Sequence, residues 1–281
     1  MKLKRLLLLC GFFYALLLSA NIMAKPQRVV SLNLCADQLL MELLPPDRLV
    51  GITQLAADSD ASYLYQKAGN FHQHSGRIEE VMALKPDLII AGQFTSQPTN
   101  QLLESLGYRV IRLGLPVTVN GIFQQINFLG EQTGQSDRAT ELIAKMQREL
   151  NALAAARDKK NLRAVVYYAN GFSAGRNTIV NEILNLAGFK NIAAELNIDH
   201  IAPLSLEALI ASNPDILLLG QLDENTDSLA HQVLRHKAID RYATLKQVTK
   251  IMVPDRYWSC AGPSSLAAAA YLQQNAFGVS N

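Results

Sequence analysis

A helix–proline–strand pattern occurs twice in this 281-residue chain and constrains its fold more than any other feature. The first copy is EEVMALKPDLIIAGQ at Glu79–Gln93, and the second is EALIASNPDILLLGQ at Glu207–Gln221. The copies align without a gap, 128 residues apart, and each begins with Glu and ends with Gly-Gln. Each copy predicts a short helix and then a strand that is apolar on both faces. Such strands are typical of parallel sheets covered by helices, so the duplication predicts two similar α/β lobes.

The segments around the two copies complete these lobes. In the N-terminal lobe, residues 25–117, we expect further strands at 28–32, 49–52 and 108–113 and further helices at 36–44 and 99–106. In the C-terminal lobe, residues 161–281, we expect strands at 162–168 and 250–253 and helices at 178–187, 229–236 and 264–275. Strands and helices that alternate in this way indicate parallel sheets.

Residues 118–160 are predicted to be a helical segment that connects the lobes. Apolar residues recur there at helical spacing, both before and after Gly134. Asp137 near the start of the second part and Arg157 near its end suit the helix dipole. No Pro-rich or Ser-rich linker is present. The expected fold is therefore α/β, with two Rossmann-like lobes that have parallel sheets and are joined by a single long backbone helix.

The N-terminus predicts export. Lys2, Lys4 and Arg5 precede an apolar run over residues 6–18, and small residues follow up to Ala24. This order is typical of a signal peptide, which we expect to span residues 1–24 and to be cleaved near Ala24, leaving a periplasmic protein. Without those three cations the chain has 23 basic residues against 24 acidic ones. Such a balance argues against nucleic-acid binding.

Two cysteines remain after the predicted cleavage, Cys35 and Cys260. An oxidising compartment allows a disulfide between them, but sequence spacing alone leaves two separate thiols equally open.

Motifs of catalysis are weak in this chain. GFSAG at 171–175 superficially resembles the nucleophile elbow of hydrolases, but no apolar helix start follows it, so Ser173 is a poor candidate nucleophile. His72, His74 and His200 offer a second alternative, a direct zinc or manganese site. A histidine pair in a polar loop is more often exposed to solvent than bound to metal. We therefore predict no catalytic residue, no metal site and no resident cofactor.

The loops at the carboxyl ends of the predicted strands carry the best candidates for ligand binding, because ligands of open α/β sheets bind there. These loops supply aromatic faces, amides and two arginines, a mixture suited to a bulky and partly anionic ligand. The candidates taken from them are Asn33, Cys35, Phe94, Phe172, Arg176, Arg256, Tyr257 and Trp258.

Five stretches together resemble the periplasmic solute-binding proteins of ABC importers for cobalamin and iron–siderophore complexes. They are RVVSLNLCADQLL at 28–40, RIEEVMALKPDLIIAG at 77–92, the helix at 137–157, SLEALIASNPDILLLG at 205–220 and VPDRYWSCAGPSSLAAAAYL at 253–272. The resemblance implies two lobes joined by one long helix. It also implies that one glutamate in each lobe, Glu79 and Glu207, contacts arginines of the membrane permease.

The resemblance further assigns Phe172, Asp255 and Arg256 to the ligand site. Tryptophans expected before the two docking glutamates are replaced near His72 and near His200, which adds both histidines as candidates. These replacements leave a cobalamin-type corrinoid, an iron–siderophore complex and haem open as the ligand. We thus expect a monomeric binding protein that delivers a metal chelate to a permease at the inner membrane. The alternatives are the direct zinc or manganese binder and an exported hydrolase or chelatase-like enzyme.

Overall fold

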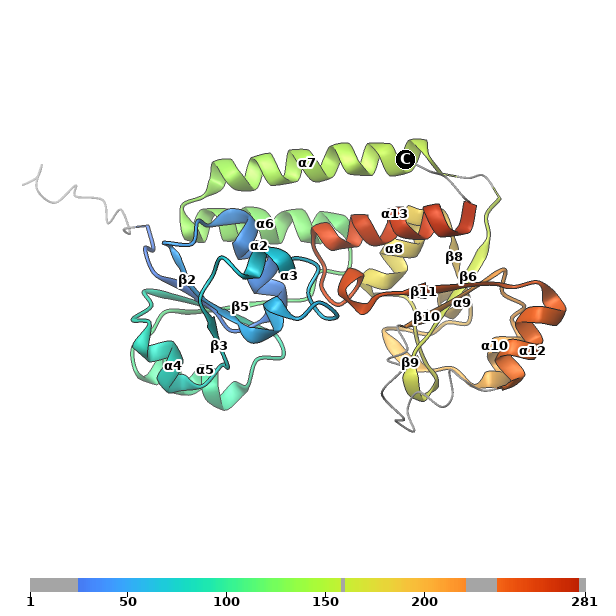
Figure 1. Ribbon diagram of the computed structural model, residues 1–281, viewed down its shortest axis with the longest axis horizontal. Coiled ribbons are helices and arrows are strands. Elements are labelled where there is room, and N and C mark those ends of the chain that lie inside the picture. The colour runs from blue at the N-terminus through green and yellow to red at the C-terminus, as the bar shows by residue number, and fades with distance from the viewer. Residues whose placement is uncertain (1–24, 158–159, 221–236, 278–281) are drawn as a thin grey trace, which may run out of the picture.

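The computed structural model describes residues 25–157, 160–220 and 237–277. The predicted signal peptide, the predicted helix at 229–236 and Gln221 of the second repeat copy lie outside the described residues. Two α/β lobes lie next to each other and are bridged along one side by helices (Figure 1). Within the described residues, no helix combines the length and the apolar character needed to cross a membrane.

The N-terminal lobe is built on a five-stranded parallel sheet in the order β3-β2-β1-β4-β5. Its strands are β1 (Val29–Ser31), β2 (Leu49–Thr53), β3 (Gln73–His74), β4 (Leu88–Gly92) and β5 (Val110–Leu113). Its helices are α2 (Leu34–Leu43), η1 (Gln54–Ala57), α3 (Tyr65–Ala68), α4 (Ile78–Ala83) and α5 (Gln97–Ser105). The edge strand β3 was not predicted, because a two-residue strand is too short to show a periodic pattern.

The C-terminal lobe has a four-stranded parallel sheet in the order β11-β10-β6-β8. Its strands are β6 (Arg163–Tyr167), β8 (Lys190–Asn191), β10 (Ile216–Gly220) and β11 (Thr249–Val253). Its helices are η2 (Ala169–Gly171), α8 (Ile179–Ala187), α9 (Ile192–Glu195), α10 (Leu206–Ala211), α12 (Lys237–Lys246), η3 (Asp255–Tyr257) and α13 (Pro263–Phe277). An antiparallel pair, β7 (Phe172–Ala174) and β9 (Ile201–Pro203), lies beside this sheet and was also not predicted.

The duplicated sequence pattern folds into the same unit twice. Helix α4 and strand β4 in the first lobe correspond to α10 and β10 in the second, and the bounds of both pairs keep the 128-residue spacing. Both strands are buried along their full length, as expected for strands apolar on both faces. The prediction of two similar lobes with parallel sheets is confirmed.

The connecting segment forms two helices, α6 (Val119–Thr133) and α7 (Ser136–Ala155), separated at Gly134. Gly134 has φ 64°, a left-handed conformation that suits glycine at a helix end. Helix α7 extends over both lobes and contacts α2 on one side and α8 and α13 on the other (Figure 1). The predicted single long helix therefore corresponds to α7, and α6 packs against it.

The hydrophobic core continues from one lobe to the other beneath α6 and α7. One buried cluster includes Leu40 of the first lobe, Ile126 and Met146 of the two connecting helices, and Ile183 and Leu272 of the second lobe. Each of these side chains is fully buried. Because separating the lobes would expose this shared apolar surface to water, the fold favours small movements of the lobes over wide opening.

Candidate ligand-binding site

A cavity of about 550 Å³ lies between the lobes, at the carboxyl ends of the central strands. This volume is within the range of ordinary ligand sites. Both lobes contribute side chains, and apolar and aromatic groups predominate. From the predicted set, the residues that line it are Asn33, Cys35, Phe94, His200 and Trp258. The cavity thus lies where the rule for strand ends places a ligand.

Asn33 forms part of the wall given by the N-terminal lobe. Its side-chain oxygen accepts hydrogen bonds from the backbone N–H groups of Cys35 (3.0 Å) and Ala36 (3.3 Å), so it caps helix α2. Strand β4 ends against this cap at Gly92, where an added Cβ would lie 2.5 Å from Asn33 Cγ. Gly92, the next-to-last residue of the first repeat copy, is therefore needed for close packing beside the cavity.

Two aromatic side chains from the C-terminal lobe also line the cavity. Trp258 is 7% exposed and packs edge-on against Tyr168, with ring centroids 6.0 Å apart and an interplanar angle of 75°. Burial and the nearby Asp255 carboxylate raise the pKa of Tyr168, so its phenol stays protonated at neutral pH. The two rings give the cavity a rigid aromatic surface.

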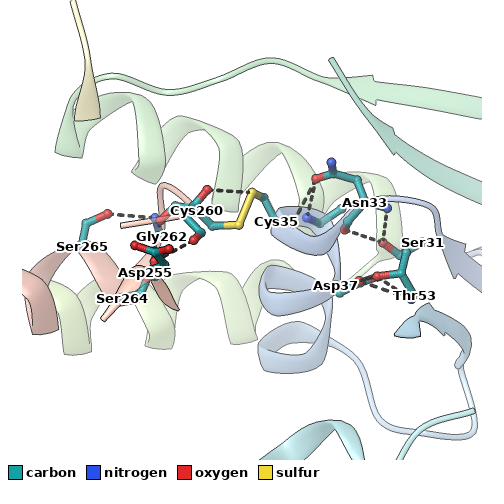
Figure 2. The surroundings of a disulfide bond; sticks show 12 residues. Ser31, Asn33, Cys35, Asp37, Thr53, Asp255, Cys260, Gly262, Ser264 and Ser265 are labelled. Carbon is teal, nitrogen blue, oxygen red and sulfur yellow. Dashed lines mark hydrogen bonds between the residues drawn. A yellow bond between two sulfur atoms is a disulfide. The ribbon is translucent and has the colours of Figure 1, made fainter. Parts of the chain in front are cut away.

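A disulfide joins the lobes at the edge of the cavity. Cys35, at the start of α2, is bonded to Cys260, which precedes α13, with a Cα–Cα distance of 5.2 Å (Figure 2). Of the two options left open by the sequence, the structure has the bridge. Because Cys35 also lines the cavity, the tether lies next to any bound ligand.

Neither of the two predicted arginines lines this cavity. Arg176 forms an ion pair with Asp199 (Nε–Oδ1 3.0 Å), and Arg256 donates to the backbone oxygen of Ser59 in the other lobe (3.2 Å). Among the described residues that line the cavity, none is Lys, Arg, Asp or Glu. The expectation of a partly anionic ligand therefore has no support from the cavity lining.

The other predicted site residues also lie outside the lining. Tyr257 packs between Tyr63 of the N-terminal lobe (5.5 Å) and Tyr271 of α13 (5.2 Å), so it braces the lobes. Asp255 accepts from Trp258 Nε1 at 3.5 Å. Phe172, on β7, is partly exposed and is not among the lining residues.

The predicted histidine cluster does not assemble. His74 is buried, and its ring nitrogens contact the Ser31 carbonyl oxygen (2.9 Å) and the Gly76 N–H (3.0 Å). Burial lowers the pKa of His74, which suits this role as a neutral hydrogen-bonded ring. His72 is exposed and away from the cavity. Across the described ranges no three side chains of His, Cys, Asp or Glu are placed to hold a metal ion.

Ser173 does not act as a nucleophile in this structure. Its side chain is fully buried, and its Oγ donates to the backbone oxygen of Val166 at 2.6 Å. The hydroxyl therefore holds β7 against β6, which explains why the elbow-like sequence does not make a catalytic site.

Residues from the loop after β5 and from the start of α8 also line the cavity and were not predicted. They include Leu115, Pro116, Val117, Ile179 and Val180. The signal that could have found the first three is the strand-end rule itself, because β5 is an edge strand of the same sheet. No local pattern marks the two residues of α8, which reach the cavity through tertiary packing.

Two parallel-sheet lobes, a shared helical brace and a cavity between the strand ends define a class of two-lobed binding proteins. Residues 29–255 match the model of the periplasmic binding protein family, and the chain belongs to that family.

Individual relatives agree with this assignment. The chain is 28% identical to a cobalamin-binding protein of Halobacterium salinarum over 225 residues, which are 79% of this chain and 61% of that relative. It thus spans less than two thirds of that relative's length. It is similar in fold to the periplasmic heme-binding protein RhuT of Roseiflexus (TM-score 0.71, 23% identity, 89% of this chain and 98% of that one). The vitamin B12-binding protein BtuF of Vibrio cholerae is similar as well (TM-score 0.66, 18% identity, 89% and 96%). These relatives are binding proteins rather than enzymes.

Proposed function

We propose that this protein captures a bulky metal chelate between its lobes and delivers it to the permease of an ABC importer. The observation that carries the proposal is the cavity itself, which both lobes line with apolar groups. Three of these groups are largely exposed to solvent: Phe94 (78%), Ile201 (59%) and Leu115 (49%). A ligand with large apolar faces would cover them and so remove them from water.

The named ligands of the relatives, cobalamin and heme, are large metal-bearing macrocycles. An iron–siderophore complex belongs to the same class of bulky chelate. A direct zinc or manganese site is disfavoured, because the described histidines neither converge nor have acidic partners in the cavity.

The permease-docking role proposed for Glu79 and Glu207 is supported by their matching positions. Both are exposed and lie in the first turn of equivalent helices, α4 and α10. These helices are on the side of their lobes away from α7 (Figure 1). Within the described residues neither carboxylate forms an ion pair, whereas the adjacent Glu80 is bound to Arg77. The two carboxylates are thus available to cations of a partner.

The proposed route places the protein in the periplasm as a monomer. The predicted signal peptide would direct export, with cleavage near Ala24. One protomer contains a complete cavity and one carboxylate in each lobe, so the proposed transport cycle needs no second copy.

A binding assay tests the chelate proposal. Purified protein is titrated with cyanocobalamin, aquocobalamin, haemin and a ferric siderophore, and quenching of Trp258 fluorescence is followed. We expect saturable quenching by at least one chelate, because Trp258 lines the cavity. A protein that binds none of them but binds free Zn²⁺ or Mn²⁺ would refute the proposal.

A paired variant tests the docking role. Glu79→Ala combined with Glu207→Ala is expected to bind the chelate with unchanged affinity, because neither residue lines the cavity. Uptake by cells carrying the cognate permease should fall at least tenfold, since two charge contacts with the permease are lost. Glu131→Ala, another exposed glutamate, is the control. Normal uptake with the paired variant would remove the docking assignment.

A further inference from the structure

His200 differs from every other described residue that lines the cavity. It supplies the one imidazole among them, and the neighbouring polar groups are neutral amides and hydroxyls. Within the described chain, no hydrogen bond or ion pair occupies its ring, in contrast to the fully engaged ring of His74. An unengaged imidazole in an apolar cavity is available to a ligand.

The backbone around His200 is held firmly. Its N–H donates to the Arg176 carbonyl oxygen and its own carbonyl accepts from the Gly175 N–H, both at 2.8 Å. At Gly175 an added Cβ would lie 1.9 Å from the Ile198 carbonyl oxygen, so the two segments approach closely. The ion pair between Arg176 and Asp199 fixes the same segment from the side.

His200 itself has φ 57°, the left-handed conformation, which costs free energy for a residue other than glycine. The two backbone hydrogen bonds of His200, with Arg176 and with Gly175, offset that cost. The backbone that bears the imidazole is therefore fixed by its neighbours. Such fixed geometry favours binding of a metal by the side chain.

A single imidazole limits the kind of metal that it can bind. A bare transition metal needs about four to six ligand atoms, and the described residues offer no such group. A metal bound here must therefore arrive in a chelate that already fills nearly all of its coordination positions. A planar four-coordinate macrocycle leaves axial positions for a side chain, whereas a hexadentate chelate leaves none.

The polar groups that line the cavity limit the charge that the periphery of the ligand can carry. Gln93 and Asn177 line the cavity, and each amide can both donate and accept hydrogen bonds. Without a lysine or arginine among the described lining residues, burying carboxylates or catecholates would leave their charges uncompensated. The lining is therefore complementary to a periphery of neutral amides.

From these observations we infer that His200 is an axial ligand to the metal of a macrocyclic chelate that has a periphery of neutral amides and is bound between the lobes. This inference rests on the proposed function and adds the chemistry of recognition. For a cobalt(III) macrocycle, a coordinate bond forms from the imidazole nitrogen as the bond from cobalt to an axial water breaks and the water leaves. No electron is transferred.

Two probes with the same macrocycle separate ligation from general binding. Aquocobalamin has an exchangeable axial water, whereas cyanocobalamin has cyanide at that position. We expect the unmodified protein to bind aquocobalamin about tenfold tighter or more, equivalent to about 1.4 kcal/mol, and to shift its visible absorption bands. His200→Ala should abolish the shift and remove the preference for aquocobalamin over cyanocobalamin. His72→Ala, an exposed histidine outside the cavity, should behave like the unmodified protein.

The outcomes distinguish this inference from the proposed function. Equal affinity for both probes with no band shift would overturn axial ligation and leave chelate capture intact. Binding of haemin or a ferric siderophore, with no binding of either cobalamin, would overturn the amide-bearing class. Failure of all four chelates to bind would overturn the proposed function itself. His200→Gln, which keeps a polar side chain of similar size, should also lose the shift if the variant folds normally by circular dichroism.

Discussion

At the scale of single residues, Asp37 links the cavity wall to the sheet below it. It lies in α2, two residues after Cys35, and its carboxylate accepts from the Thr53 hydroxyl (2.5 Å) and the Thr53 N–H (3.3 Å) (Figure 2). Burial raises its pKa to about 7, and the hydrogen bonds from Ser31 and Thr53 only partly oppose that effect. At neutral pH the Asp37 carboxyl group, which lies beneath the ligand site, is therefore only partly ionised.

This shift predicts how stability depends on pH. The folded protein keeps the Asp37 proton up to about pH 7, whereas the unfolded chain releases it near pH 4. The stability that this group contributes is full below about pH 4 and is lost as pH rises to about 7. The loss is on the order of 4 kcal/mol. Urea unfolding at a series of pH values measures it.

The variant Asp37→Asn should remove this part of the pH dependence, because an amide does not titrate in this range while its oxygen still accepts from Thr53. Asp47→Asn, at an exposed position, is the control and should leave the curve unchanged. Identical pH profiles for Asp37→Asn and the unmodified protein would contradict the assigned pKa.

At the scale of elements, the repeated Pro-Asp sequence has the same structural role in both copies. Asp87 accepts from the backbone N–H groups of Gln27 (2.7 Å) and Arg28 (3.0 Å) at the start of β1. Asp215 accepts from the N–H of Arg163 (2.8 Å) at the start of β6. Each aspartate therefore fixes the strand next to its own, so the repeat unit organises the neighbouring strand as well.

Removing these contacts should destabilise each lobe by a similar amount. Asp215→Ala is expected to cost about 1 kcal/mol, and Asp87→Ala slightly more, because it leaves two N–H groups to water instead of one. The expected decrease in Tm is about 2–4 °C. Asp60→Ala, an exposed residue of the N-terminal lobe, serves as the control. Unchanged Tm values for both variants would show that water replaces these acceptors without loss.

At the scale of the whole molecule, covalent and noncovalent contacts restrict the relative movement of the lobes. The disulfide closes a chain segment of 225 residues, and Arg256 and Tyr257 add contacts with the N-terminal lobe close to it. The shared core beneath α6 and α7 forms a further connection. The two lobes are therefore held together both near the cavity and along the side that α6 and α7 cover.

Loss of the disulfide should act on both stability and ligand exchange. Cys35→Ser combined with Cys260→Ser is expected to lower the free energy of unfolding by about 2–5 kcal/mol, because the unfolded chain regains conformational freedom. The chelate should dissociate several-fold faster, since the cavity wall loses its tether. Urea unfolding and stopped-flow dissociation measure the two effects. Treatment of the unmodified protein with reductant should reproduce both, and the doubly substituted variant should not respond to it.

Equal dissociation rates with and without the disulfide would show that the shared core and the Arg256–Ser59 contact suffice to fix the lobes. In that case, Arg256→Gln in the disulfide-free variant should make the chelate dissociate faster.

The sequence by itself determined the two lobes, their parallel sheets and the region of the cavity. Periodicity and the repeat are local properties of the chain, and they report burial on one or both faces of an element directly. Of the residues that the strand-end rule selected, Asn33, Cys35, Phe94 and Trp258 line the cavity. His200 came from a departure from the family pattern.

Only the tertiary structure decided which of the candidates face the cavity. Arg256 was assigned to the ligand, but its partner Ser59 lies 197 residues away in the chain, and Arg176 is held by Asp199. The pairing of Cys35 with Cys260 is equally long-range. A side chain's partner depends on how distant segments pack, and no local spacing encodes that packing. For the same reason, the engaged ring of His74 and the unengaged ring of His200 could be told apart only in the folded protein.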